Sequence, residues 1–348
     1  MKLYKSITII LIVFLKTGNL LSENNLFNVN NIKLEKKDNV STNALTNKAI
    51  KSGFDQLIRK ILLEDDIKKV SELNFSEIKQ LVTFYQISNS IDSNSKEELV
   101  NFSVTFDKDK IHNLFFKRNI LYSEITDKEL YILPILIEND EIYIFNNNFF
   151  YSNWNEIYKE NLIEFILPLE NIEIIQNINN NRDNLINLNV KNLFKEYSNK
   201  NLALILIENN KADFKKIYLK AVIQGKNISK SLNFKKQKQD FVKFNEIIIK
   251  ETKNEIINLV KSENLIDIGT PSFLNVKMYL NKKTNFVELN SIIKNIDLIE
   301  NVYVQDFNKD YMNLRIKYLG KLNKIMQQLK NKSINLELIN ESWIIRSL

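Results

Sequence analysis

The chain is 348 residues long and carries 49 Lys and Arg against 42 Asp and Glu, for a net charge of +7. This excess is small and dispersed, whereas nucleic-acid binders cluster their cations, so we expect no nucleic-acid partner. Cysteine is absent, which excludes disulfides, thiolate catalysis and cysteine metal sites. The densest basic stretch, Lys226–Lys243, is expected to be a solvated loop that leads into a helix.

The first 22 residues have the three parts of a secretory signal peptide. Lys2 and Lys5 precede the apolar run Ser6–Leu15, and the polar stretch Lys16–Ser22 follows it. A run this short does not cross a bilayer as a helix, which needs about 20 residues. We expect cleavage after residue 22 and a periplasmic protein; the alternative is an uncut segment that anchors the chain in the inner membrane, the only membrane contact we expect. The absence of cysteine and the abundance of Asn, Lys and Ile favour a bacterial envelope protein.

A flexible lead is expected over residues 23–40, and a first α+β module over residues 41–155. Apolar residues at helical spacing between Ala44 and Leu62 predict a long amphipathic helix that Ser41 or Thr42 caps. The module's further elements are a short helix behind Asn74 or Ser76, a strand over Val100–Phe106, a helix behind Asp107, and strands over Leu130–Ile137 and Glu141–Phe145. Pro134 predicts that the strand containing it lies at a sheet edge or carries a bulge.

A connector is expected over residues 156–190, because Asn177–Asn189 is of low complexity. A middle α+β module should follow over residues 191–265. Its elements are three strands over Leu202–Ile207, Ile217–Ile223 and Ile228–Phe234, and a long helix over Phe241–Lys261.

The last module, residues 272–348, has the clearest pattern. Apolar residues predict strands near residues 276–280, 302–304, 314–318 and 336–338, with helices over 287–295 and 322–329. The order strand, helix, strand, strand, helix, strand is that of a ferredoxin-like βαββαβ split sandwich. Trp343–Ile345 could add one more strand. The fold class expected for the chain is therefore α+β, in several small modules.

Four stretches resemble a proteobacterial family of exported proteins catalogued as domain of unknown function 2066. They are the helix TNKAIKSGFDQLIRKIL (46–62), FSVTFDKDKIHNLFFKRNILYSE (102–124), LYILPILIENDEIYIFNNNFFYSNW (130–154) and LRIKYLGKLNKIMQQL (314–329) followed by Trp343. The resemblance implies an exported protein without assigned catalysis, and it carries over no catalytic residue.

Few residues have the chemistry of a catalytic site. His112 is the only histidine, and we expect it to be exposed on a helix. One histidine cannot build a His-rich zinc site, and the five glycines form no phosphate-binding loop. The carboxylate groups Glu64-Asp65-Asp66 and Glu138-Asp140-Glu141 could bind calcium or act as acid and base, but each is expected in a solvated turn. We therefore assign no catalytic, cofactor-binding or metal-binding residue and no cofactor.

The leading hypothesis is a non-enzymatic structural or adaptor protein of a bacterial envelope assembly, with an envelope protein as its partner. Residues expected on a partner or ligand surface are Trp154, in the aromatic cluster Phe149–Trp154, and Trp343 and Ile345, in the segment Trp343–Leu348 that could form a free sheet edge. For the aromatic cluster itself, the favoured interpretation is a plug that closes the core of the first module, and an open aromatic pocket is the alternative. The alternatives are a periplasmic binder of a small molecule or peptide and a carboxylate-based envelope hydrolase.

Overall fold

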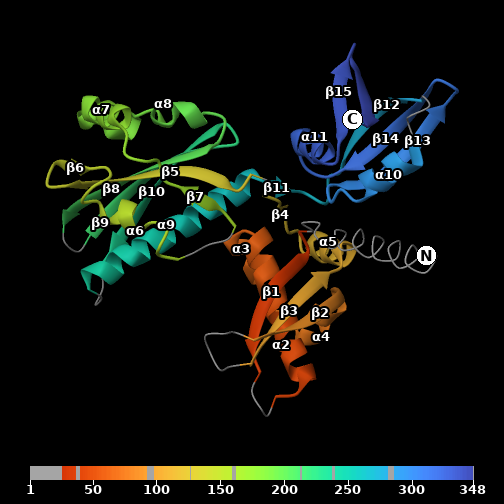
Figure 1. Ribbon diagram of the computed structural model, residues 1–348, viewed down its shortest axis with the longest axis horizontal. Coiled ribbons are helices and arrows are strands. Elements are labelled where there is room, and N and C mark those ends of the chain that lie inside the picture. The colour runs from red at the N-terminus through yellow and green to blue at the C-terminus, as the bar shows by residue number, and fades with distance from the viewer. Residues whose placement is uncertain are drawn as a thin grey trace, which may run out of the picture. The chain divides into compact units, whose positions relative to one another are not determined.

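The computed structural model has an α+β fold, as expected, and describes residues 26–36, 40–91, 98–125, 127–158, 162–211, 214–236, 240–280 and 286–347 (Figure 1). The chain divides into two compact units. Unit 1 is made of residues 1–122 and 266–348, and unit 2 of residues 123–265. The chain leaves unit 1 through β4 (Tyr122–Ser123) and returns through β11 (Leu265–Ile266), and these two short strands pair with each other. Unit 2 is thus inserted into the sequence of unit 1.

This division differs from the expected modules 41–155, 156–190 and 191–265. The strand β5 (Glu129–Glu138) pairs in parallel with β8 (Asn201–Lys211), so residues assigned to the first and middle modules share one sheet. Parallel pairing of this kind joins segments far apart in sequence, and the hydrophobic pattern of either strand alone does not reveal it.

The first part of unit 1 is a three-stranded antiparallel sheet in the order β1 (Asn28–Glu35), β3 (Glu98–Phe106), β2 (Val82–Ile91). Helix α2 (Thr42–Ile61), capped by Ser41 as predicted, packs on β1 and β3. Gly53 permits the close approach, because a Cβ there would lie 3.0 Å from Ile32 Cδ1. The expected flexible lead is wrong for its described part: β1 lies in the sheet, and Phe27 and Ile32 are buried in the core. The proposed signal peptide lies outside the described residues.

Three short helices complete this part: α3 (Glu64–Val70), α4 (Phe75–Gln80) and α5 (Lys108–Lys117). Asn74 and Glu77 form a capping box at the start of α4, and the Asp107 carboxylate accepts from the Lys110 N–H at the start of α5. Both caps are local sequence signals, which explains why these helix starts were predictable.

The rest of unit 1 is a five-stranded sheet in the order β13-β14-β12-β16-β15, with helices α10 and α11. Its elements are β12 (Ser272–Tyr279), α10 (Phe286–Lys294), β13 (Ile299–Phe307), β14 (Tyr311–Tyr318), α11 (Leu322–Asn331), β15 (Ile334–Ile339) and β16 (Ser342–Ser347). The elements up to β15 follow the predicted chain order. The arrangement in space differs from a four-stranded split sandwich, because β16 lies between β12 and β15, parallel to the first and antiparallel to the second.

The reason is a tight turn. Asn340 and Glu341 both have positive φ, 47° and 62°, as in the two-residue type I′ hairpins whose twist suits adjacent strands. The turn folds β16 back against β15, and β16 occupies the place next to β12.

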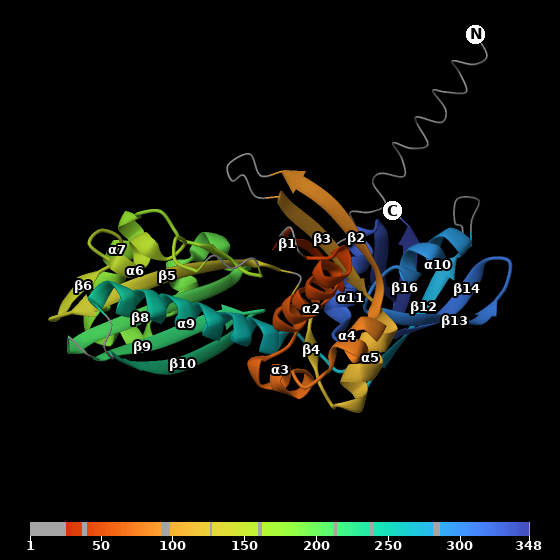
Figure 2. The ribbon, with the colours of Figure 1, turned by 90° about the horizontal axis from the view of Figure 1, so that it is seen from below.

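Unit 2 contains a six-stranded sheet in the order β10-β9-β8-β5-β6, with β7 also paired to β5. The strands not yet introduced are β6 (Glu141–Tyr143), β7 (Glu164–Ile166), β9 (Phe214–Ile223) and β10 (Lys226–Lys235). Helix α9 (Phe241–Glu263) and the short α6 (Phe149–Asn153) cover one face, and α7 (Ile172–Asn180) and α8 (Val190–Leu193) cover the other (Figures 1 and 2). Alternate residues of β8 enter the two cores: Ala203 and Ile205 on the α9 side, Leu202 and Leu204 on the α7 side.

The expected connector 156–190 is therefore wrong as well. Its second half folds as α7, the 3₁₀ segment η2 (Arg182–Asn187) and the start of α8, and Ile178, Leu185 and Leu188 are buried against the sheet. The Asn-rich composition suggested a linker, yet the few apolar residues between the asparagines are enough to bury one face.

Pro134 occupies a local gap in the sheet. On one side of β5, β7 pairs with residues 129–131 and β6 with residues 136–138, so the stretch around Pro134 faces no strand there. The buried Asn148 side chain fills this gap. Its Nδ2 donates to the carbonyls of Pro134, Tyr143 and Ile144 at 2.9 to 3.0 Å, and its Oδ1 accepts from the N–H of Phe150 and Tyr151. The predicted sheet edge or bulge at Pro134 is therefore wrong for the strand, because β5 lies inside the sheet; Pro134 is accommodated at a position where no strand pairs with it on that side.

Replacing Asn148 with Asp should destabilise the fold by about 2 to 4 kcal/mol, because a buried carboxylate would face three carbonyl oxygens with no proton to donate. Urea unfolding followed by circular dichroism measures the change. The control is Asn192→Asp, an exposed position of the same unit, where we expect a change within about 0.5 kcal/mol. Equal stability of the two variants would show that the Asn148 hydrogen bonds are not needed.

Candidate functional site

The residues expected on a partner or ligand surface lie mainly in the core. Trp154 is 1% exposed and packs edge-to-face on Phe165, with ring centroids 6.1 Å apart. Ile345 is fully buried, and Trp343 is half-buried. The assignments of Trp154 and Ile345 to a partner or ligand surface are therefore wrong. Both side chains are buried and stabilise the fold, whereas Trp343 keeps part of its side chain exposed.

The expected free edge Trp343–Leu348 is wrong for residues 343–347, its described part. The strand β16 pairs with β12 on one side, where Val276 lies opposite Trp343, and with β15 on the other. Strand β16 is therefore an interior strand of the sheet and not a free edge. Deleting it would remove the strand that joins β15 to the rest of the sheet.

The aromatic cluster Phe149–Trp154 closes a core. Phe150 and Trp154 are both 1% exposed, which favours the core interpretation over an open aromatic pocket. Beside Trp154, the buried Lys253 Nζ donates to the Ile157 and Tyr158 carbonyls at 2.8 and 3.1 Å. The rings of Trp154 and Phe165 lie 5.9 and 5.4 Å from the same Nζ, so this cation is held by carbonyls and aromatic faces.

His112 is buried, which corrects the expectation of an exposed helix histidine. Its ring lies 5.5 Å from that of Phe27 and 5.2 Å from that of Tyr122, and its Nε2 has no hydrogen-bond partner among the described residues. Burial, assisted by the charge of Lys108, lowers the pKa of His112 to about 4. The imidazole is therefore neutral at pH 7 and packs as an aromatic ring; the partnerless nitrogen does not form a catalytic triad.

The two carboxylate groups lie in separate local structures. Glu64, Asp65 and Asp66 form the first turn of α3, where negative charge is favourable, and Asp66 pairs with Lys69 at 2.6 Å. The second group surrounds the turn between β5 and β6, where Glu141 accepts from the Tyr143 hydroxyl at 2.5 Å. Within the described ranges, no three His, Cys, Asp or Glu side chains come together as metal ligands would.

Glu138 takes part in a buried polar network that the sequence did not indicate. It accepts from Asn209 Nδ2, and Asn209 Oδ1 accepts from the buried Lys215 Nζ at 2.7 Å. The Nζ also lies 4.6 Å from the Phe241 ring centroid. Burial lowers the pKa of Lys215 to about 8, although the charge of Glu138 opposes the shift. The contacts account for a buried lysine that joins β8, β9 and the start of α9.

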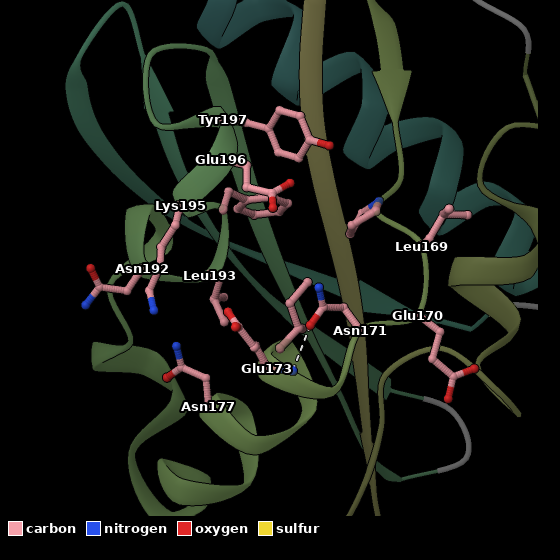
Figure 3. Close-up of a pocket in the computed structure, with 13 residues that line it drawn as sticks. Leu169, Glu170, Asn171, Glu173, Asn177, Asn192, Leu193, Lys195, Glu196 and Tyr197 are labelled. Carbon is pink, nitrogen blue, oxygen red and sulfur yellow. Dashed lines mark hydrogen bonds between the residues drawn. The ribbon is translucent and has the colours of Figure 1, made fainter.

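A cavity of about 280 Å³ lies in unit 2 between the segment Pro168–Asn177 and the segment Asn192–Tyr197 (Figure 3). Its lining combines the carboxylates of Glu170, Glu173 and Glu196 with Lys195, asparagine amides and the ring of Tyr197. The Asn171 side chain is engaged at the start of α7, where its Oδ1 accepts from the Glu173 N–H at 2.7 Å.

The chemistry of this cavity is limited. A glycosidase pair depends on one carboxyl group in an apolar, buried setting. All three glutamates are exposed, and so is the adjoining Leu169. The volume is below the range of about 300 to 1,000 Å³ that is usual for ligand pockets. These features give little support to the hydrolase alternative.

The strand β2 presents exposed apolar side chains at a sheet edge. No strand was expected there from the sequence. Phe84, Tyr85 and Ile87 are 45%, 45% and 42% exposed, and every side chain over residues 83–88 is exposed. Tyr85 lies opposite Val104 and Ile87 opposite Phe102, the β3 residues buried beneath α2. Directly paired residues lie on the same face of a sheet. The apolar face that α2 covers on β1 and β3 therefore extends onto β2, where Tyr85 and Ile87 are exposed to solvent. One edge of β2 also pairs with none of the other described strands.

The sequence did carry a signal for β2. Its first six residues, VTFYQI, are rich in β-branched and aromatic residues, as strands are. The signal was missed because apolar residues occur on both faces, so the alternation typical of a half-buried strand is absent.

Among the described helices, none is both long and apolar enough to span a membrane.

The free energy of unfolding should fall as the pH is lowered from about 6.5 to about 4. In this range His112 binds a proton in the unfolded state, whereas burial keeps it neutral in the folded state. The expected loss is about 3 kcal/mol. The free energy of unfolding is measured at both pH values for the wild type and for His112→Phe, which removes the titrating group and keeps an aromatic ring. The loss due to His112 is the amount by which the wild type falls more than the variant. The single histidine also permits a direct NMR titration, and a pKa near 6.5 in the folded protein would contradict the expectation.

Comparison of the chain with protein-family models, curated proteins and solved structures finds no match. The resemblance to the exported-protein family therefore stays a hypothesis, and the function has to be argued from the structure itself.

Proposed function

We propose that this protein is a non-enzymatic docking protein of a bacterial envelope assembly, which binds an envelope protein by adding a strand of that partner to β2. Strand addition joins backbone N–H and C=O groups across a free sheet edge, and the side-chain positions supply specificity. The observation that carries the proposal is the edge of β2, which pairs with no strand in the described part of the chain, has no charge and is flanked by exposed apolar side chains.

Natural proteins protect long edge strands with charges, bulges or prolines, because an open edge invites association. The other long edges of the described sheets follow this rule. Strand β10 carries Lys226, Lys230 and Lys235; β13 has two bulges together with Glu300 and Asp306. Charged residues are also present on β1 and β15.

The strand β2 lacks this protection. Its ten residues, VTFYQISNSI, include no charged residue and no proline. Its one irregularity lies at the very start, between Val82 and Phe84. A long edge without protection is a hazard in a protein that stays alone, and a binding surface in one that has a partner.

The exposed apolar side chains add a second reason. Tyr85 and Ile87 extend the core face of the sheet, and Phe84 lies on the opposite face. A strand added beside β2 would have its own side chains on both faces of the sheet, and these would cover part of all three residues. The envelope location rests on the signal-peptide pattern in the first 22 residues, which agrees with a partner encountered outside the cytoplasm.

The test places a photo-crosslinking amino acid at Tyr85 in the full chain, expressed in the bacterium that encodes it. We expect a crosslink to one protein, reduced about tenfold by Ile87→Lys, because a lysine on the apolar face of an edge opposes strand addition. In the purified complex, hydrogen exchange should also slow at those amides of residues 84–88 that point away from β3.

The matched control places the same amino acid at Phe307, which is 71% exposed on the protected edge strand β13. Few crosslinks are expected there. Equal and nonspecific crosslinking at both positions, or unchanged exchange in residues 84–88, would refute docking at β2.

A further inference from the structure

A basic groove of about 720 Å³ lies between α4 and α5 of unit 1. Its charged lining residues are Lys79, Lys110, Lys117, Arg118 and Glu77, four cations against one carboxylate. Helix α4 leads directly into β2, with α5 alongside it (Figure 2). The groove therefore lies at the end of the sheet where β2 begins.

The groove is held in shape by backbone contacts of its own cations. Lys110 Nζ donates to the Gln80 carbonyl at 2.9 Å, and Arg118 Nη1 donates to the Lys69 carbonyl. The carboxylate of Glu77 is engaged by the Asn74 N–H at 2.9 Å in the capping box. Outside the lining, Asp107 lies 3.6 Å from Lys110 and offsets part of its charge. The groove keeps a net positive charge, and Lys79 and Lys117 are exposed in it.

The groove adjoins the start of β2, because Val82 both lines the groove and begins the strand. The strands of this sheet are all antiparallel, so we take an antiparallel addition as the geometry. A partner strand that runs antiparallel to β2 would reach the groove at its own carboxyl end.

We infer that the partner segment is an extended stretch of alternating apolar residues followed, on its C-terminal side, by a cluster of Asp and Glu that occupies the basic groove. This inference rests on the proposed docking at β2 and names the chemistry of its occupant. The apolar part matches Tyr85 and Ile87, and the acidic part matches the four cations. Carboxylates in such a cluster gain most at low salt, where exposed charges are least screened.

The test selects peptides from a random twelve-residue display library on the full chain. We expect enriched peptides to have alternating apolar residues and a C-terminal acidic cluster. The best peptide is then synthesised, together with a version in which Asn and Gln replace its acids, and both are titrated at low salt by fluorescence anisotropy.

The double variant Lys79→Glu/Lys117→Glu should weaken the acidic peptide about tenfold and leave the neutral version nearly unchanged. The control Lys235→Glu/Lys294→Glu makes the same change in net charge at exposed positions elsewhere and should have little effect. Ile87→Lys should weaken both peptides.

The other outcomes separate the two proposals. Peptides that lose binding with Ile87→Lys but carry no acidic bias, or carry it at their N-terminal end, would overturn this inference and leave docking at β2 standing. Acidic peptides indifferent to Ile87→Lys would overturn the assignment of groove and edge to one partner segment. Absence of any peptide that depends on Ile87 would overturn both proposals, and binding of the groove to phosphatidylglycerol vesicles in its place would assign it to a membrane surface.

Discussion

The parallel pairing of β5 with β8 is the constraint on which the architecture depends. Eight successive residue pairs, from Leu130–Asn201 to Ile137–Glu208, hold these strands together. Both strands are buried on both faces, so each must be covered by helices, and α6, α9, α7 and α8 supply that cover. The pairing closes residues 123–265 into one unit, and the short pair β4 and β11 joins the two passages of the chain into and out of it.

In unit 1, by contrast, part of the apolar face of a sheet is left without a covering helix. Helix α2 covers β1 and β3, but the apolar face continues onto β2, where Tyr85 and Ile87 remain exposed. Burial of that strip would be favourable, since about 25 cal/mol is gained for each Å² of apolar surface removed from water. Strand β2 thus combines exposed apolar side chains with an edge that pairs with no described strand, and both would gain from a partner. The basic groove at its start adds charge to the same place.

Local signals predicted much of the fold. The caps at Ser41, Asn74 and Asp107 and the apolar periods behind them predicted the helix starts, and β8, β9, β10 and the strands from β12 to β15 followed their patterns. The expected site was less predictable. Trp154 and Ile345 are large and apolar, which suits a binding surface and a core equally, and only packing distinguishes them. The same holds for His112, whose polar neighbours along the helix suggested exposure although its own face turns to Phe27 and Tyr122.

By itself the sequence determined the α+β class, the order of most elements and the absence of thiol chemistry, because these follow from local periodicity and composition. Tertiary structure alone decided which strands are edges. The turn at Asn340 and Glu341 places β16 inside its sheet, and the position of α2 leaves β2 outside the helix cover. Whether a strand is an edge depends on pairing partners that are distant in sequence, and a strand's own residues do not encode those partners. For this protein the distinction matters, since the surface proposed for function is an edge.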